Sequence, residues 1–135
     1  MKKILVFLLT MFGILVNANV RMPLLFSDGM VLQRNKPIPV WGWADSNGKW
    51  MLKLDVEKAG GPFELIITGK NKIVIKDVLV GEVWICSGQS NMEFQVYKTM
   101  NAKAEIDDSN YPMIRHFGVA QDLSGSPKED LKAGK

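Results

Sequence analysis

FELIITGKNKIVIKDV, residues 63–78, contains two apolar runs that are separated by the polar stretch GKNK at residues 69–72. Both runs are rich in β-branched residues, and a short glycine-containing break between such runs is typical of a β-hairpin. The sequence therefore predicts two antiparallel strands joined by a tight turn.

The sequence upstream has the same texture. Short, largely apolar stretches lie at residues 20–33, 37–44 and 49–56; Asp28-Gly29 interrupts the first, and Asp45-Ser46-Asn47-Gly48 separates the last two. In the run KWMLKLDV, Trp50, Leu52 and Leu54 alternate with residues of a second, more polar face, as in a strand with one buried side. Residues 19–80 are therefore predicted to form a β-sandwich-like domain.

Four large aromatic residues lie in this half, namely Trp41, Trp43, Trp50 and Phe63. They can fill the core of a sandwich or an interdomain contact, because large aromatics dominate apolar burial. They can also stack on sugar rings. Spacing alone does not separate these two interpretations.

The pattern changes after Ile75. VLVGEVWIC, residues 78–86, is almost continuously apolar, which is typical of a strand buried on both faces in a parallel sheet. SGQSN then supplies a turn, residues 92–106 are largely helix-compatible, and PMIRHFGV at residues 112–119 is a candidate second strand. Residues 81–135 are therefore predicted to begin an α/β layer with a strand, a turn and a helix.

The N-terminus has the layout of a secretory signal peptide. Two lysines precede an apolar run from Ile4 to Val16, which is shorter than the ~20 residues that span a bilayer, and in Val16-Asn17-Ala18 the positions before the expected cut are Val and Ala. Residues 1–18 are expected to be removed, which predicts a secreted or periplasmic protein without a membrane anchor. The remaining chain has 15 basic and 14 acidic residues, and this balance gives no sign of a nucleic-acid surface. The single cysteine, Cys86, excludes an internal disulfide and is predicted to be a buried small hydrophobe.

Ser90 is the candidate nucleophile because of its place after the apolar run. A turn between a buried strand and a helix exposes a serine and can aim its backbone N–H at a developing oxyanion. Gly88 would allow a sharp turn, but Met92 stands where the G-x-S-x-G elbow has its second glycine, which disfavours an α/β-hydrolase. From the residues alone, a turn or helix-capping serine remains the alternative.

GEVWICSGQSNMEF, residues 81–94, resembles the nucleophile block of the sialate O-acetylesterase family, a branch of the SGNH-type hydrolases. RMPLLFSDGMVLQRNKPIPVWGWA, KDVLVGEVW and NYPMIRHF are similar to other early landmarks of that family, in the same order. The resemblance implies a flavodoxin-like three-layer α/β domain and an exported esterase that releases acetate from O-acetylated sialic acid or other acetylated saccharides, with no metal or other cofactor. It also implies that Ser90 is the nucleophile and that its N–H is one oxyanion donor, with Gly88, Gln89 and Asn91 shaping the motif.

The chain departs from the family pattern in two places. The family has further strand sequence near Ala44-Asp45, so the sandwich is expected to be incomplete. Its catalytic Asp and His lie in a D-x-x-H block that this chain does not contain, so the chain is interpreted as the N-terminal part of a longer protein and is expected to be inactive alone.

Other candidate residues carry weaker signals. His116 is the only histidine but has Met113 three residues before it, and it is interpreted as a strand or surface residue. Asp107 and Asp108 are interpreted as a solvated helix end, and no His or Cys cluster has metal-ligand spacing. An exported, non-catalytic sugar-binding sandwich is the alternative function.

Overall fold

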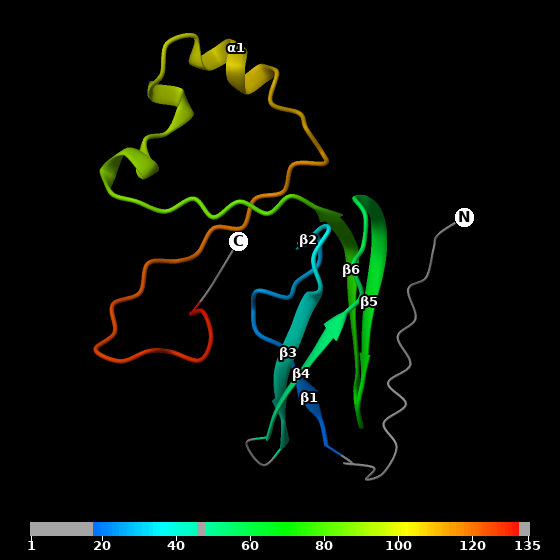
Figure 1. Ribbon diagram of the computed structural model, residues 1–135. Coiled ribbons are helices and arrows are strands. Elements are labelled where there is room, and N and C mark those ends of the chain that lie inside the picture. The colour runs from blue at the N-terminus through cyan, green and yellow to red at the C-terminus, as the bar shows by residue number, and fades with distance from the viewer. Residues whose placement is uncertain (1–17, 46–47, 133–135) are drawn as a thin grey trace.

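The computed structural model describes residues 18–45 and 48–132. The predicted signal peptide, residues 1–18, lies outside the described residues except for Ala18. In these described ranges six strands form two small sheets, followed by two 3-10 turns and one short helix (Figure 1). No helix in the described ranges is long and apolar enough to cross a membrane.

The first sheet has the order β1-β3-β4, with β1 at Val20–Arg21, β3 at Ile38–Ala44 and β4 at Gly48–Leu54. Strands β3 and β4 pair antiparallel from Ile38↔Leu54 to Ala44↔Gly48. The alternation predicted for β4 is confirmed, since Leu54 is buried and Met51 is exposed.

The second sheet has the order β2-β6-β5, with β2 at Val31–Gln33, β5 at Gly60–Thr68 and β6 at Lys72–Gly81. The hairpin predicted around GKNK is confirmed, because β5 and β6 pair antiparallel up to Thr68↔Lys72. Strand β2 runs parallel to β6 on its other edge.

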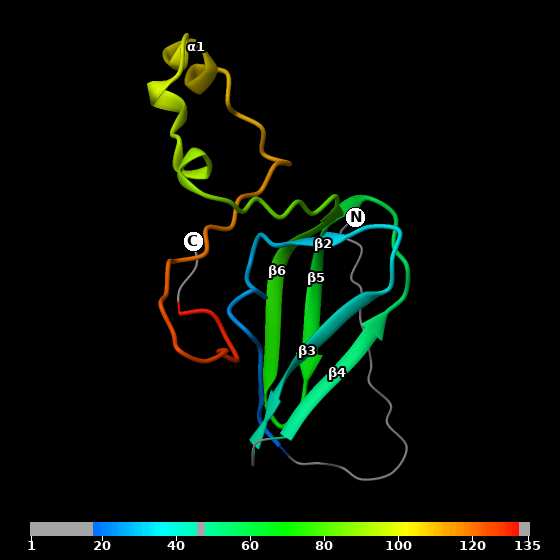
Figure 2. The same ribbon diagram turned by 60° about the vertical axis from the view of Figure 1, so that its left-hand side comes forward.

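The two sheets pack against each other and enclose the core, as Figure 2 shows from the side. Ile38, Val40 and Leu54 come from the first sheet and meet Leu65, Ile75 and Val78 of the second. Facing sheets each bury one side, and their inward side chains interdigitate. The predicted β-rich half is therefore observed as two small packed sheets.

Beyond Gly81 the structure differs from the predicted strands. Val78, Leu79 and Val80 are buried in β6, but the strand ends at Gly81, and Trp84, Ile85 and Cys86 are exposed. A strand buried on both faces needs paired strands and covering layers, and no described strand pairs with residues 82–88. The prediction of a buried Cys86 is wrong for the same reason.

Residues 82–132 are irregular apart from three short elements. These are the 3-10 turns η2 at Ser90–Glu93 and η3 at Val96–Lys98, and the helix α1 at Ala102–Asp107. The candidate strand at residues 112–119 is not formed, and only Val119 has an isolated bridge. Residues 82–132 contain no buried residue.

Candidate functional site

Ser90 is the first residue of the 3-10 turn η2 and is exposed to solvent. Gln89 precedes it in extended backbone, and the Met92 N–H donates to the Gln89 carbonyl at 2.8 Å. A Cβ added at Gly88 would lie 2.7 Å from Cγ of Met92, so the absence of a side chain there lets the turn close against Met92. The predicted turn is therefore present, although an exposed extended stretch precedes it in place of a strand.

The hydroxyl of Ser90 has no hydrogen-bonded side-chain partner within the described ranges. Glu93, which lies in the same turn, accepts a hydrogen bond from Nε2 of Gln121 at 2.6 Å. His116 is exposed, which confirms its interpretation as a surface residue. A serine hydroxyl without a base is a poor nucleophile, and the described residues place no base at the hydroxyl of Ser90.

The two aspartates at the end of α1 have local partners. The Asp107 carboxylate accepts from Nζ of Lys103 at 2.5 Å, and the Asp108 carboxylate accepts from the Tyr111 hydroxyl at 3.4 Å. Both are exposed, as predicted for a solvated helix end. No group of three or more His, Cys, Asp or Glu side chains in the described part could hold a metal ion.

Glu82 fixes the start of the segment that carries Ser90, where the chain leaves β6. Its Oε1 accepts from Nε of Arg34 at 2.6 Å and its Oε2 from Nε2 of Gln33 at 2.9 Å, while Oε1 of Gln33 accepts the N–H of Val83 at 3.0 Å. The hydrogen bonds from Gln33 and then Arg34 lower the pKa of the Glu82 carboxyl. We call Gln33, Arg34 and Glu82 the Glu82 anchor.

The returning end is fixed by Arg115, which lies next to His116. Its Nη1 and Nη2 donate to the two carboxylate oxygens of Asp77 at 2.7 and 3.3 Å, and its Nε donates to the Pro112 carbonyl at 2.9 Å. Hydrogen bonding to Arg115 lowers the pKa of Asp77, and the same bond raises the pKa of Arg115. We call Asp77 and Arg115 the Arg115 anchor.

Neither anchor is predicted by a sequence pattern. The sequence does contain one signal, which is the position of two charged residues at the apolar run from Val78 to Cys86. Asp77 directly precedes this run, and Glu82 interrupts it. Both belong to KDVLVGEVW, one of the stretches that carry the family resemblance, and Arg115 belongs to NYPMIRHF. The fold brings these separate landmarks together.

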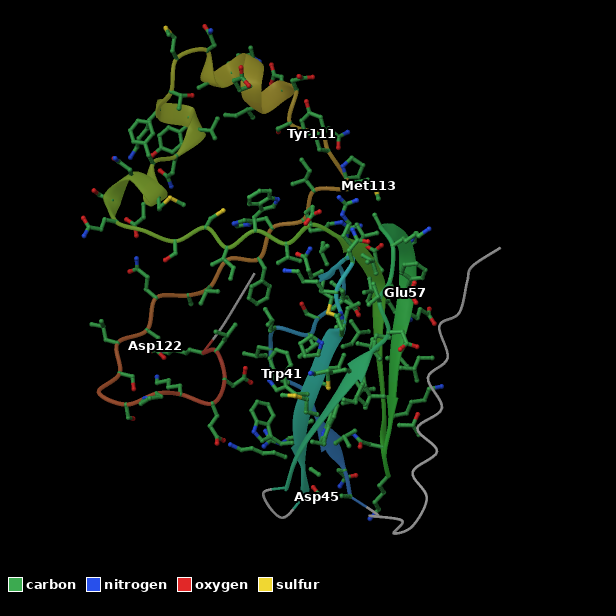
Figure 3. The ribbon with its side chains drawn as sticks, in the orientation of Figure 1. Trp41, Asp45, Glu57, Tyr111, Met113 and Asp122 are labelled. Carbon is green, nitrogen blue, oxygen red and sulfur yellow. The ribbon has the colours of Figure 1, made fainter. Side chains whose placement is uncertain are left out.

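The aromatic residues of the sandwich are part of its packing. Trp43 is only 8% exposed, and Nε1 of Trp50 donates to the Trp43 carbonyl at 3.2 Å. Trp41 makes an edge-to-face contact with Phe26, with ring centroids 4.8 Å apart. Figure 3 shows Trp41 on the sandwich, whereas Tyr111 and Met113 lie on the segment that returns from α1. The core interpretation of Trp41, Trp43, Trp50 and Phe63 is confirmed.

Comparison with known proteins confirms the resemblance seen in the sequence. No family model matches the chain. Sialate O-acetylesterase of Rattus norvegicus is 43% identical over 88 residues, covering 61% of this chain and 16% of that protein. Sialate O-acetylesterase of Mus musculus is 39% identical over 93 residues, covering 64% of this chain and 17% of that protein.

A solved structure extends the match to the fold. The crystal structure of a carbohydrate acetylesterase from Xanthomonas citri superposes with a TM-score of 0.81 at 34% identity, covering 87% of this chain and 32% of that one. The chain therefore matches about a sixth of the length of the curated relatives and about a third of the solved chain.

Proposed function

We propose that the chain is the N-terminal, nucleophile-bearing part of a carbohydrate O-acetylesterase. The observation that carries the proposal is the exposed Ser90 at the start of a turn, in a chain similar to sialate O-acetylesterases and to a carbohydrate acetylesterase. The substrate class is an O-acetylated sialic acid or another acetylated saccharide. The domain division is a sandwich at 19–80 and the first part of an α/β esterase domain at 81–135.

In the proposed reaction, Oγ of Ser90 attacks the acetyl carbonyl and loses its proton to a base. The sugar hydroxyl leaves with that proton, and an acetyl-serine remains. Water, deprotonated by the same base, then attacks the acetyl-serine and releases acetate. The backbone N–H of Ser90 is one donor to the oxyanion in both steps.

The base and its orienting carboxylate are proposed to come from residues outside this chain. This assignment is supported by the environment of Ser90, because no described side chain hydrogen-bonds to its hydroxyl and the adjacent anchor holds Arg115, not His116. The 135-residue chain alone is therefore expected to hydrolyse an aryl acetate almost not at all. Robust turnover that Ser90→Ala abolishes would overturn this assignment and make His116 the candidate base.

The function is tested by acetate release from the full-length gene product. An O-acetylated sialic acid and an acetylated neutral saccharide are offered to wild type, Ser90→Ala and Ser126→Ala. We expect Ser90→Ala to lower kcat by at least about a thousandfold. Ser126, an exposed serine on the C-terminal stretch, serves as the control and should keep wild-type turnover. Equal activity of the two variants would refute the proposal.

Export is proposed from residues 1–18. Expression in the native host should place the protein outside the cytoplasm, and sequencing of its N-terminus should begin at Asn19. A cytoplasmic protein that still starts at Met1 would contradict the proposed signal peptide.

The packing of the sandwich aromatics argues against sugar binding as a second function. Trp43 is buried, and Trp41, Trp50 and Phe63 pack against the core, which leaves little ring face for a sugar.

A further inference from the structure

The segment between the two anchors, residues 83–114, is a loop that leaves β6 and returns to it. In Figures 1 and 2 the outgoing and returning stretches lie side by side near β2 and β6, while α1 lies farther from the strands. We call residues 83–114 the Ser90 segment. Its orientation relative to the sandwich depends on what holds these two ends.

In the described part of the chain, the hydrogen bonds between the Ser90 segment and the sandwich lie at the two ends of the segment. Within the described ranges, the hydrogen bonds of residues 84–114 stay within residues 84–121, as in the turns that end at Phe94 and Thr99. The bonds to the sandwich begin at Val83, Glu82 and Arg115. Displacement of either end would therefore move Ser90 without breaking its own turn.

The sheet is shaped to present Asp77. Between Leu65↔Ile75 and Phe63↔Val78 the ladder advances two residues on β5 and three on β6, which is a β-bulge. Asp77 lies in this bulge with φ 56°, a left-handed conformation that is uncommon for a residue other than glycine. Bulges re-aim side chains, and this one turns the Asp77 carboxylate toward Arg115.

The loop before β2 completes the bulge. The Asp28 carboxylate accepts the Lys76 N–H at 2.7 Å, and the Gly29 N–H donates to the Lys76 carbonyl at 3.0 Å. A Cβ at Gly29 would lie 3.3 Å from Nη1 of Arg115, and Gly29 has φ 79°. The guanidinium of Arg115 therefore lies against the loop at Gly29, and the backbone of that loop requires glycine at this position.

Arg115 has a geometry that fixes direction as well as charge. A guanidinium that pairs bidentately with a carboxylate constrains the orientation of both groups, which a lysine does not do. With Nε bound to the Pro112 carbonyl, all three nitrogens of Arg115 are used.

We propose that the Glu82 and Arg115 anchors are positioning devices for the nucleophile: the first ties the start of the Ser90 segment to the end of β2, and the second ties its end to β6, so that Ser90 is correctly placed for its base and substrate. The proposal rests on the proposed function of Ser90. Gln33, Arg34, Asp77, Glu82 and Arg115 are then positioning residues that touch neither substrate nor reacting atoms.

The test uses variants that change the anchors and leave the core intact. Asp77→Asn keeps the size of the side chain, and asparagine tolerates the left-handed conformation. Glu82→Gln is similarly isosteric. Asp107→Asn is the matched control, because it removes an exposed ion pair that is local to α1.

Hydrogen exchange in the 135-residue chain tests the structural half of the proposal without catalysis. Asp77→Asn should speed exchange at Ile114, whose N–H donates to the Tyr111 carbonyl, and Glu82→Gln at Val83, several-fold in each case, with exchange in β3 to β6 unchanged. Unchanged exchange at both ends would overturn the anchors even if Ser90 proves to be the nucleophile. If Asp77→Asn also loosens the sheet, Arg115→Lys and Arg115→Met replace it, because they leave every sandwich residue intact.

Kinetics of the full-length gene product test the positioning half. We expect each anchor variant to lower kcat roughly tenfold while KM stays within about twofold, because misplacement of a reacting group by about 1 Å can cost up to a hundredfold in rate. Arg115→Lys should retain more turnover than Arg115→Met. Anchor variants that match Asp107→Asn would overturn the positioning role, whereas full activity in Ser90→Ala would instead refute the proposed function.

Discussion

The sandwich and the segment that follows it differ in where their apolar side chains go. Every buried hydrophobic residue of the described chain lies between Ala18 and Val80. Residues 82–132 contain many exposed hydrophobics, including Trp84 at 82% and Leu123 at 100% exposure. The first region is thus stabilised by its own core, whereas the second depends on its anchors and on surface contacts. The residues that carry the proposed chemistry therefore lie outside the part of the chain that is stabilised by its own core.

The largest expected change in the free energy of unfolding comes from comparing two leucines, one from each region. Leu54→Ala opens a cavity between the two sheets, because Leu54 is 3% exposed, and should lower the free energy of unfolding by about 3 kcal/mol. Leu123→Ala removes a fully exposed side chain and should change the free energy of unfolding by less than about 0.5 kcal/mol. Urea unfolding of both variants measures the difference. Equal losses would mean that the second region has a core of its own.

Two glycines, one from each region, give the next largest expected difference in the free energy of unfolding. A Cβ at Gly42 would lie 2.1 Å from the Arg21 carbonyl oxygen and 2.8 Å from Cζ2 of Trp50, so Gly42→Ala should force β1 and β3 apart and cost about 2 kcal/mol. Gly125 has no atom within 4 Å of such a Cβ, and Gly125→Ala should change the free energy of unfolding by less than about 0.5 kcal/mol. Thermal or urea unfolding distinguishes them, and a stable Gly42→Ala variant would contradict the β1–β3 packing.

The smallest effect concerns pH and the anchors that join the two regions. The pKa of Asp77 lies below its ordinary value of 3.8 and that of Glu82 below its ordinary value of 4.5. A lowered carboxyl pKa contributes stability that is fully present above the ordinary pKa and is lost as pH falls through the folded-state pKa. The difference in urea midpoint between wild type and Asp77→Asn should therefore be constant above about pH 5 and shrink below about pH 4. A difference that grows as the pH falls would have the wrong sign for these ion pairs.

The sandwich could be predicted from the sequence because its signals are local. Alternation in residues 49–56 indicates the buried face of β4, and GKNK between two β-branched runs indicates the β5–β6 hairpin. Each pattern depends on neighbours only a few residues apart, so one sequence suffices to find it.

The Ser90 segment could be predicted only in part. The turn at Ser90 and the helical tendency of residues 98–106 follow from composition, and α1 lies at Ala102–Asp107. Burial of Val83 to Cys86 could not be judged, because an apolar run indicates a preference for burial and not whether neighbouring strands exist to provide it. The Arg115 anchor joins residues 38 apart through a bulge, and no local pattern indicates such a pair.

The most direct test of Ser90 as the nucleophile is to locate the acetyl group during turnover. The full-length gene product would be mixed with an acetylated saccharide, quenched in acid within the first turnovers and digested for peptide mass spectrometry. An acetyl adduct on Ser90 that disappears as acetate is released is the result that a serine nucleophile predicts. Acetate release without any adduct on Ser90, or with an adduct on another residue, would contradict it.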